Sequence, residues 1–159
     1  MNNGESYEGD FKKWNKEGNG KYYYSNGDIY EGDWKNDEKE GKGIYYYNHD
    51  ECKGDRYVGD WKNGRKEGNG IYYYNNGDKY EGELKNGMQN GKGIYYYDCG
   101  DRYEGEFKNG LKEGKGIYYY NNDEIKGDIF EAEYKNGKQE WKGIIYFNNG
   151  NRYEGYIKN

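Results

Sequence analysis

Residues 80–102 read YEGELKNGMQNGKGIYYYDCGDR, and this stretch decides the fold. Its first five residues, Tyr80–Leu84, alternate acidic residues with apolar or small ones, as a β-strand with two different faces does. Asn86-Gly87 is a typical hairpin turn, and a second short strand is predicted from Gly93 to Tyr97. A further turn at residues 98–101 leads onward, so the stretch predicts one β-hairpin followed by another strand.

The opening of this stretch, an aromatic residue followed two positions later by a small one, occurs seven times. The copies begin at Tyr7, Tyr30, Tyr57, Tyr80, Tyr103, Phe130 and Tyr153, with steps of 23, 27, 23, 23, 27 and 23 residues. Fixed periods of this size indicate stacked repeats. We therefore predict an all-β fold, an elongated single-layer twisted antiparallel meander of six hairpin repeats and a half repeat. Residues 1–6 form a short lead-in, and residues 7–159 form a single domain.

The two longer steps contain four extra residues each, within residues 48–55 and 121–128. The series 23, 27, 23 occurs twice, as expected if a block of three hairpins was duplicated. The second copy replaces His49 and Cys52, so the insertions are interpreted as structural features. Whether these loops bind anything is left open by the sequence.

The composition is unusual for a globular domain. Hydrophobic residues make up 31% and charged residues 35% of the chain, a balance that is typical of disorder. Aromatic residues nevertheless reach 20% and recur at fixed spacing, which indicates an ordered repeat with a thin core. The net charge of −5 disfavours nucleic acid and anionic lipid as partners held by bulk attraction. No apolar run predicts a signal peptide or a membrane span.

One face of the sheet is expected to be the packed one, because a ring laid over a strand glycine shields the backbone and restores buried area. The predicted packing residues are Tyr30, Gly32, Trp34, Tyr57, Gly59, Trp61, Tyr80, Gly82, Leu84, Tyr103, Gly105 and Phe107.

The opposite face, which we call the Ile/Tyr face, is the candidate partner-binding surface. Its residues are Ile44, Tyr46, Ile71, Tyr73, Ile94, Tyr96, Ile117, Tyr119, Ile144 and Tyr146. Acidic strands such as the one with Glu81 and Glu83 alternate with these pairs, so their summed field favours a basic or amphipathic protein segment. The alternative is that isoleucine and tyrosine occur here only because they suit exposed strands.

Catalytic chemistry is hard to place in this sequence. His49 is the only histidine, and it is interpreted as a solvated loop residue rather than a metal ligand or general base. Cys52 and Cys99 lie in turns two repeats apart and are predicted to be free thiols, as in a cytoplasmic protein. We expect no catalytic residue, no metal site and no cofactor, so the chain is not predicted to be an enzyme.

Seven lysines recur at the sixth position of each repeat: Lys12, Lys35, Lys62, Lys85, Lys108, Lys135 and Lys158. An acidic residue precedes most of them by two positions. The favoured interpretation is a solvated, ion-paired row, and the alternative is a ridge that binds lipid headgroups.

The repeat Y-x-G-x-[W/F]-x-x-G-x-x-x-G-x-G resembles the MORN (membrane occupation and recognition nexus) repeat. Asp55–Gly64 and Glu67–Gly70 match it closely, and the resemblance covers residues 7–159. Departures gather near the end, where Ala132 replaces the motif glycine and Trp141 replaces the first glycine of G-x-G. Asp37 replaces the turn glycine of the second repeat.

The resemblance implies a non-catalytic protein–protein interaction scaffold in a cytoskeletal or ciliary (axonemal) assembly, cytoplasmic in location. One alternative is a membrane tether or phospholipid-binding protein of the same family. A less favoured one is a cell-wall choline-binding repeat module, which needs tryptophan-rich cages. Contact between copies, end to end or as a homodimer, through the half repeat Tyr153–Asn159 also stays open.

Overall fold

The computed structural model of the chain describes residues 4–121 and 125–156, without the side chain of Trp141. The middle of the second insertion, Lys158 and the end of the half repeat lie outside these residues. The strands are β1 (Ser6–Lys12), β2 (Asn15–Tyr23), β3 (Ile29–Lys35), β4 (Glu38–Tyr46), β5 (Arg56–Lys62), β6 (Arg65–Tyr73), β7 (Lys79–Lys85), β8 (Met88–Tyr96), β9 (Arg102–Lys108), β10 (Leu111–Tyr119), β11 (Ile129–Lys135), β12 (Lys138–Tyr146) and β13 (Arg152–Tyr156). A 3-10 helix, η1 (Asp50–Cys52), lies in the first insertion.

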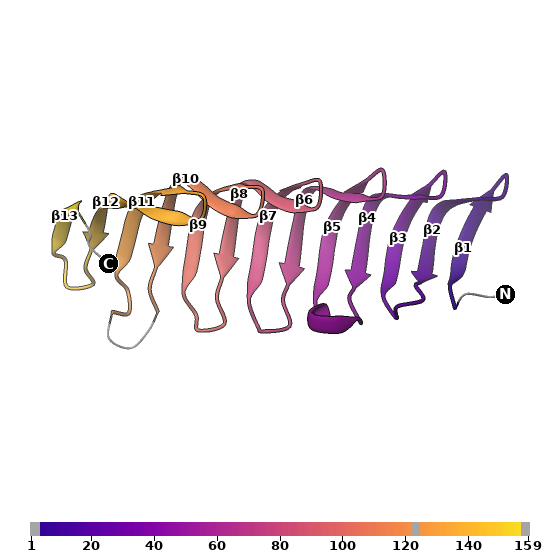
Figure 1. The fold of residues 1–159 in the computed structure, drawn as a ribbon, viewed down its shortest axis with the longest axis horizontal. Coiled ribbons are helices and arrows are strands. Elements are labelled where there is room, and N and C mark those ends of the chain that lie inside the picture. Colours follow the sequence, from indigo (N-terminus) through magenta and orange to yellow (C-terminus); the bar gives the residue numbers. More distant parts are fainter. Residues whose placement is uncertain (1–3, 122–124, 157–159) are drawn as a thin grey trace. The chain divides into compact units, whose positions relative to one another are not determined.

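The strands follow one another in sequence order and pair antiparallel, so the predicted all-β meander is confirmed. The chain divides into two compact units. The first comprises the described residues up to Asn76 together with Leu84–Gly87, and the second comprises Gly77–Glu83 and the described residues from Met88 onward. Within each unit, neighbouring strands lie side by side and are joined by tight turns, and η1 lies between β4 and β5 (Figure 1).

Left-handed residues form the turns inside the hairpins. Asn86 and Gly87 have φ values of 52° and 84°, the conformation that an Asn-Gly hairpin turn requires. The second repeat keeps this turn without glycine, since Asn36 and Asp37 have φ values of 49° and 68°. The Asp37 carboxylate accepts a 2.8 Å hydrogen bond from the backbone N–H of Lys16 in the preceding hairpin. That bond compensates for placing a non-glycine residue in the left-handed region.

The second strand of each hairpin is longer than predicted. β8 begins at Met88, whereas the sequence placed its start at Gly93. The extra residues are separated from the rest by a β-bulge. In the third hairpin the pairing of β5 with β6 shifts between Gly59 and Trp61, and the facing Gly68 has a φ of 74°.

The acidic residue at each bulge has a structural function that the sequence did not reveal. Asp60 accepts a hydrogen bond of 3.0 Å from the backbone N–H of Asn69, and Asp33 accepts one of 2.9 Å from that of Lys42. The predicted row of lysines is solvated as expected, but the structure does not show its predicted ion pairs among the described residues. Its six described lysines, Lys12 to Lys135, are exposed, and the salt bridges of the described residues involve other side chains.

Aromatic rings over glycines form the thin core, on what we call the aromatic face. Tyr57 is 0% exposed, and Trp61 in the same strand is 5% exposed. A Cβ atom built on Gly59 or on its cross-strand partner Gly70 would overlap the Tyr57 side chain. Glycine at these two positions therefore lets the ring lie directly on the backbone.

These rings also connect one repeat to the next. The Tyr30 ring lies edge-on to Trp34, with 5.2 Å between ring centroids, and edge-on to Trp61 of the following repeat, at 5.1 Å. In the second unit, Tyr103 contacts Phe107 at 5.3 Å and Tyr134 at 4.9 Å. Edge-to-face pairs at such distances are favourable beyond the area they bury.

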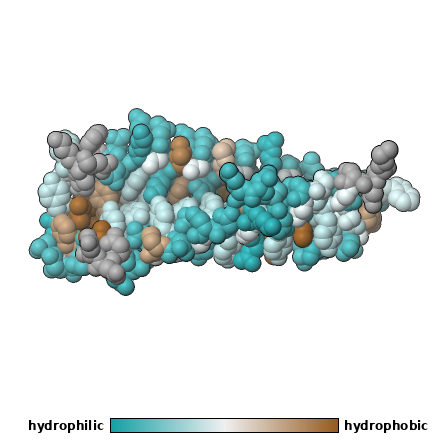
Figure 2. Space-filling model, turned by 60° about the horizontal axis from the view of Figure 1, so that its bottom comes forward, coloured by the Kyte–Doolittle hydropathy of each residue, from teal (hydrophilic) through white to brown (hydrophobic). Residues whose placement is uncertain are grey.

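Most of the surface visible in Figure 2 is hydrophilic, and the hydrophobic residues appear as isolated spots. The described part of the chain contains no helix that is long and apolar enough to cross a membrane.

Candidate protein-binding site

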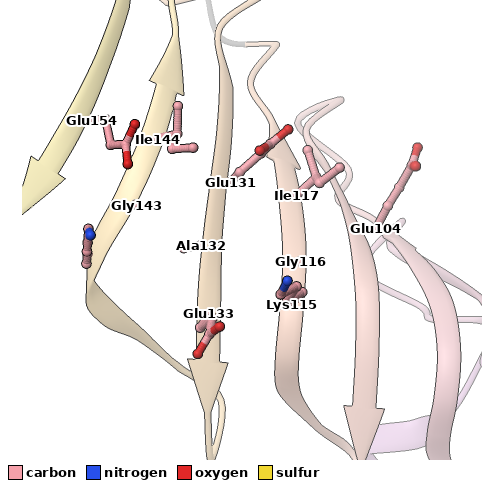
Figure 3. Close-up of a pocket in the computed structure, with 11 residues that line it drawn as sticks. Glu104, Lys115, Gly116, Ile117, Glu131, Ala132, Glu133, Gly143, Ile144 and Glu154 are labelled. Atoms are coloured by element: carbon pink, nitrogen blue, oxygen red, sulfur yellow. The ribbon is translucent and has the colours of Figure 1, made fainter.

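The structure aligns the Ile/Tyr face in rows across the strands. In the second unit, Ile117 of β10 pairs with Glu104 on one side and with Glu131 on the other. Ile144 of β12 pairs with Glu131 and with Glu154. Isoleucine and glutamate thus alternate along one continuous row. Figure 3 shows these five side chains following one another over neighbouring strands.

This row borders a groove of about 500 Å³ on the second unit. Ile117 and Ile144 contribute its apolar lining, next to Gly116, Ala132 and Gly143. These small residues pair with one another across β10, β11 and β12, and their backbone forms the floor of the groove, because their side-chain positions point to the aromatic face. A groove with a narrow apolar floor can accept one or two apolar side chains of a partner.

Charged side chains of both signs surround the groove. Glu104, Glu131, Glu133 and Glu154 line it together with Lys115 and Lys142. Two of the glutamates are paired within their own strands, since Arg102 binds Glu104 at 2.8 Å and Arg152 binds Glu154 at 2.6 Å. Glu131 and Glu133 form no ion pair with the residues that the structure describes. Their charges remain available to a cation that approaches the centre of the row.

A second row on the same face contains the tyrosines. The guanidinium carbon of Arg102 lies 3.9 Å from the ring centroid of Tyr119, and Arg152 lies 5.8 Å from that of Tyr146. In the first unit, Arg56 covers Tyr73 at 4.3 Å. Cation–π contacts of this kind stabilise the positions of the rings.

The first unit has the same face with a different sequence of side chains. Its row runs from Glu31 through Ile44 and Val58 to Ile71. Valine stands where the second unit has a glutamate, so this row is more apolar and less acidic. All ten residues predicted for the Ile/Tyr face are partly buried.

On the aromatic face, the structure reveals lysines that the sequence analysis missed. Lys39 pairs with Trp34 across β3 and β4, and its ammonium lies 4.6 Å from the ring centroids of both Tyr45 and Trp61. Burial lowers the pKa of Lys39 to about 8, and it lowers the pKa values of Lys66 and Lys112 to about 8 as well. The surrounding rings favour the charged ammonium and act against this shift.

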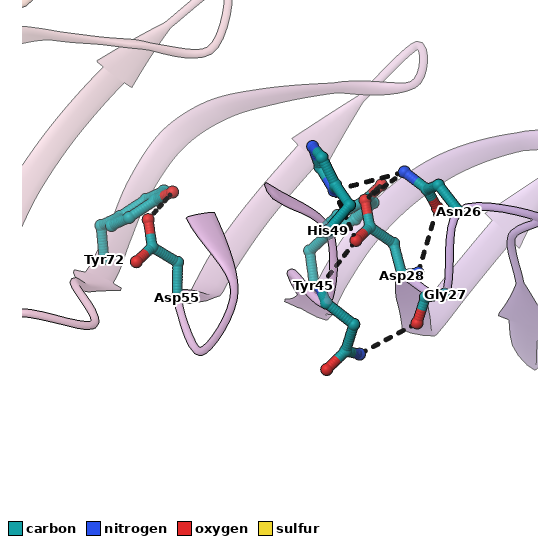
Figure 4. Close-up of polar contacts among 8 residues, drawn as sticks. Asn26, Gly27, Asp28, Tyr45, His49, Asp55 and Tyr72 are labelled. Carbon is teal, nitrogen blue, oxygen red and sulfur yellow. Dashed lines mark hydrogen bonds and ion pairs between the residues drawn. The ribbon is translucent and has the colours of Figure 1, made fainter. Parts of the chain in front are cut away.

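Buried aspartates link consecutive repeats. Asp28 is 1% exposed, and its carboxylate accepts hydrogen bonds from the Tyr45 hydroxyl and the Asn48 backbone N–H, both at 2.8 Å (Figure 4). Burial acts to raise the pKa of Asp28, but its hydrogen bonds, the first of them from His49, lower it overall. Asp55 binds Tyr72 and Asn75 in the same way, at 2.7 and 2.8 Å.

His49 lies in the loop before η1 with a partly exposed side chain, and the structure adds a partner that the sequence did not reveal. Its Nδ1 atom lies 2.7 Å from Oδ1 of Asp28, and this contact raises the pKa of the imidazole. The sequence singles out His49 as the one histidine, but it does not indicate that Asp28 is its partner, because the two are 21 residues apart. Cys52 and Cys99 are free thiols. Among the described residues, no group of three or more His, Cys, Asp and Glu side chains could hold a metal ion.

The family described as MORN repeat matches residues 7–29, 30–50, 57–79, 80–102, 103–124 and 130–152. This chain belongs to the MORN-repeat family. The gaps between matches that follow residues 50 and 124 coincide with the two insertions, so the MORN unit resumes in register after each. No curated protein sequence matches the chain.

Two solved structures are similar to this MORN chain. The SAS-4 (dCPAP) TCP domain of Drosophila melanogaster, in complex with a proline-rich motif of Ana2 (dSTIL), aligns with a TM-score of 0.54 and 17% identity over 89% of this chain and 73% of that one. The G-box domain of the microcephaly protein CPAP aligns with a TM-score of 0.37 and 12% identity over 88% of this chain and 87% of that one. At such identities, the first likeness is one of fold alone.

Proposed function

We propose that this MORN-repeat chain is a non-catalytic scaffold that binds a basic amphipathic segment of another protein through its Ile/Tyr face. The observation that carries the proposal is the groove over β9–β13, where Ile117 and Ile144 alternate with glutamates. An apolar side chain of the partner enters the groove, and lysines or arginines beside it meet Glu131 and Glu133. Charge complementarity of this kind gives orientation and a faster association rate.

The titratable side chains form structural hydrogen bonds, and this supports a non-catalytic function. The aspartates at positions 28, 55 and 101 are committed to hydrogen bonds between repeats, and His49 is committed to Asp28. These groups serve the stacking of the repeats. The complex of the Drosophila SAS-4 domain supports a protein as the class of partner for such a sheet. A cytoskeletal or ciliary assembly is the setting that the MORN family favours, and the location of the tagged chain in its native cell tests it.

The test uses a fluorescent amphipathic peptide with leucines on one helical face and lysines and arginines on the other. It is titrated with the full chain at physiological salt. We expect saturable binding that weakens at least tenfold in Ile117→Glu and Ile144→Glu. Leu111→Glu is the matched control, because Leu111 is an exposed apolar residue of the same strand as Ile117 and does not line the groove.

Two results would contradict the proposal. One is equal affinity of all three variants for the peptide, with unchanged circular dichroism spectra. The other is binding of the chain to phosphatidylserine vesicles that survives physiological salt while the peptide does not bind. The second result would favour the membrane-tether alternative.

A further inference from the structure

The aromatic face of the first unit carries another surface, which the proposed function does not use. We propose that it binds a proline-rich segment of a partner protein in the polyproline II conformation, lying across the strands. The binding surface is what we call the tyrosine ladder. It consists of Tyr22, Tyr24, Tyr45, Tyr47, Tyr72 and Tyr74.

The ladder is a continuous row of rings over three repeats. Neighbouring ring centroids are 4.6 Å apart in Tyr22–Tyr24, 5.6 Å in Tyr24–Tyr45, 4.6 Å in Tyr45–Tyr47, 5.8 Å in Tyr47–Tyr72 and 4.5 Å in Tyr72–Tyr74. All six residues are partly buried. The hydroxyl groups of Tyr22, Tyr45 and Tyr72 donate to carboxylates of Glu5, Asp28 and Asp55, so these rings are held in fixed positions. Grooves lined by fixed aromatic rings are the surfaces on which proline-rich segments dock.

The spacing of the ladder selects the conformation of the ligand. Each repeat contributes two strands, so equivalent ring pairs recur about every 9.6 Å along the sheet. One turn of polyproline II, three residues, advances about 9.3 Å and returns the side chain to the same direction. A β-strand covers a similar distance in three residues but then points to the opposite side. An α-helix covers about 9.6 Å in about 6.4 residues, so no residue of the helix returns to the same direction at that distance. Polyproline II alone meets each ring pair with the same side of the ligand.

Lysines beside the ladder complement the backbone of such a ligand. The ammonium groups of Lys16, Lys39 and Lys66 lie 4.4, 4.6 and 4.6 Å from the ring centroids of Tyr22, Tyr45 and Tyr72. The carbonyl groups of polyproline II have no internal hydrogen-bond partner and accept from such donors. The lysine row is complete only in the first unit, because Gln89 and Gln139 occupy two of the three equivalent positions in the second. The first unit is therefore the predicted site.

The test compares two fluorescent peptides of twelve residues with the same eight prolines and four alanines. One has alanine at every third position, and the other has the residues in an aperiodic order. Both adopt polyproline II, so a difference in affinity reports the match with the repeat. We expect the periodic peptide to bind the full chain at least fivefold more tightly, and a Gly/Ser peptide of the same length not to bind.

Variants of the chain locate the site. Tyr47→Leu interrupts the ladder and should weaken binding of the periodic peptide at least tenfold. Tyr73→Leu is the matched control, because Tyr73 lies on the Ile/Tyr face against Arg56, and it should leave the affinity unchanged. Lys66→Gln keeps every ring and copies the residue found at position 89, so it tests the ammonium separately, with an expected loss of at least threefold. Circular dichroism verifies that each variant is folded.

Three outcomes would overturn the inference. They are equal affinity for the periodic and aperiodic peptides, equal effects of Tyr47→Leu and Tyr73→Leu, and binding of an oligoglutamate peptide in the absence of proline-peptide binding. The last would show that the lysines form an anion site. None of these outcomes bears on the groove of the second unit, which a different peptide tests.

Discussion

The Tyr45 hydroxyl donates a hydrogen bond of 2.8 Å to Oδ2 of Asp28, a buried carboxylate of the preceding repeat. The other carboxylate oxygen of Asp28 accepts from the Asn48 backbone at 2.8 Å. The same two bonds recur at Asp101, from Tyr118 at 2.9 Å and Asn121 at 2.6 Å. A thin sheet has little apolar area to hold its repeats together, so each buried aspartate adds a polar link between neighbours.

Removing one of these aspartates should destabilise the fold strongly. Asp101→Ala leaves two part-buried donors, the Tyr118 hydroxyl and the Asn121 N–H, without their acceptor. We expect a loss of about 3 kcal/mol in the free energy of unfolding. Asp128→Ala is the natural comparison, because Ile145 stands where the other repeats have the tyrosine. Among the described residues, the donor that loses the Asp128 carboxylate is the Asn148 N–H. That loss should be about 1–2 kcal/mol. Urea denaturation measures both values, and equal losses would contradict the assigned contribution of the tyrosine hydroxyl.

The sixth repeat indicates how tightly the core is packed. Elsewhere a tyrosine hydroxyl lies over a glycine, as Tyr103 does over Gly105, but the sixth repeat has Phe130 and Ala132. The missing hydroxyl leaves room for the added methyl group. Gly105→Ala alone should therefore destabilise the fold by about 2 kcal/mol through overpacking.

A double-mutant cycle tests this coupling. Combining Gly105→Ala with Tyr103→Phe should recover at least half of the lost stability, although Tyr103→Phe also removes the hydrogen bond to the Glu106 carbonyl. Thermal denaturation of the four proteins provides the cycle. Additive losses would show that the two substitutions in the sixth repeat are unrelated.

The contact of His49 with Asp28 predicts a pH-dependent stability. The pKa of His49 is raised above 6.5, so its contribution is present below that pH and is lost as the pH rises through the raised value. The pKa of Asp28 is lowered below 3.8, so its contribution is lost only at lower pH. Between these limits the wild type should be more stable than His49→Asn. The difference in melting temperature should shrink as the pH rises through the raised pKa of His49. A difference that stays unchanged over that rise would contradict the ionic contribution.

The partly buried lysines among the rings of the aromatic face predict a second pH effect with the opposite direction. Their pKa falls from 10.5 to about 8 on folding, so stability increases as the pH rises from 8 toward 10.5. Burial raises the pKa of Tyr103 from 10.0 to about 12, so its contribution is lost only above pH 10. As the pH rises from 8 to 10, the stability of the Lys112→Gln variant should increase less than that of the wild type. Parallel melting curves for the two proteins over that range would contradict the shift of the Lys112 pKa.

The sequence predicted the hairpins and their order in one antiparallel meander, because both depend on residues close together in the chain. The Asn86-Gly87 turn and the alternation in Tyr80–Leu84 are sufficient for one hairpin, and the constant steps extend it to the others. The start of β8 was misplaced because Gly91, with a φ of 85°, resembles a turn residue in the sequence; the equivalent Gly68 faces the bulge between β5 and β6.

Contacts between repeats could not be predicted in the same way. Asp28 meets Tyr45 and His49 at separations of 17 and 21 residues, and nothing local to any of them indicates the others. The bulge also moves Lys66 opposite Trp61 and onto the aromatic face, where simple alternation does not place it. The recurring Lys or Gln at this position was the available signal.

Chemical-shift mapping of the full chain with the basic amphipathic peptide tests the central claim most directly. The claim predicts that the largest backbone shifts occur at Ile117, Glu131 and Ile144, and that Ile144→Glu abolishes them. Shifts confined to other surfaces, or none at a peptide concentration of 1 mM, which corresponds to about −4 kcal/mol of binding free energy, would contradict it.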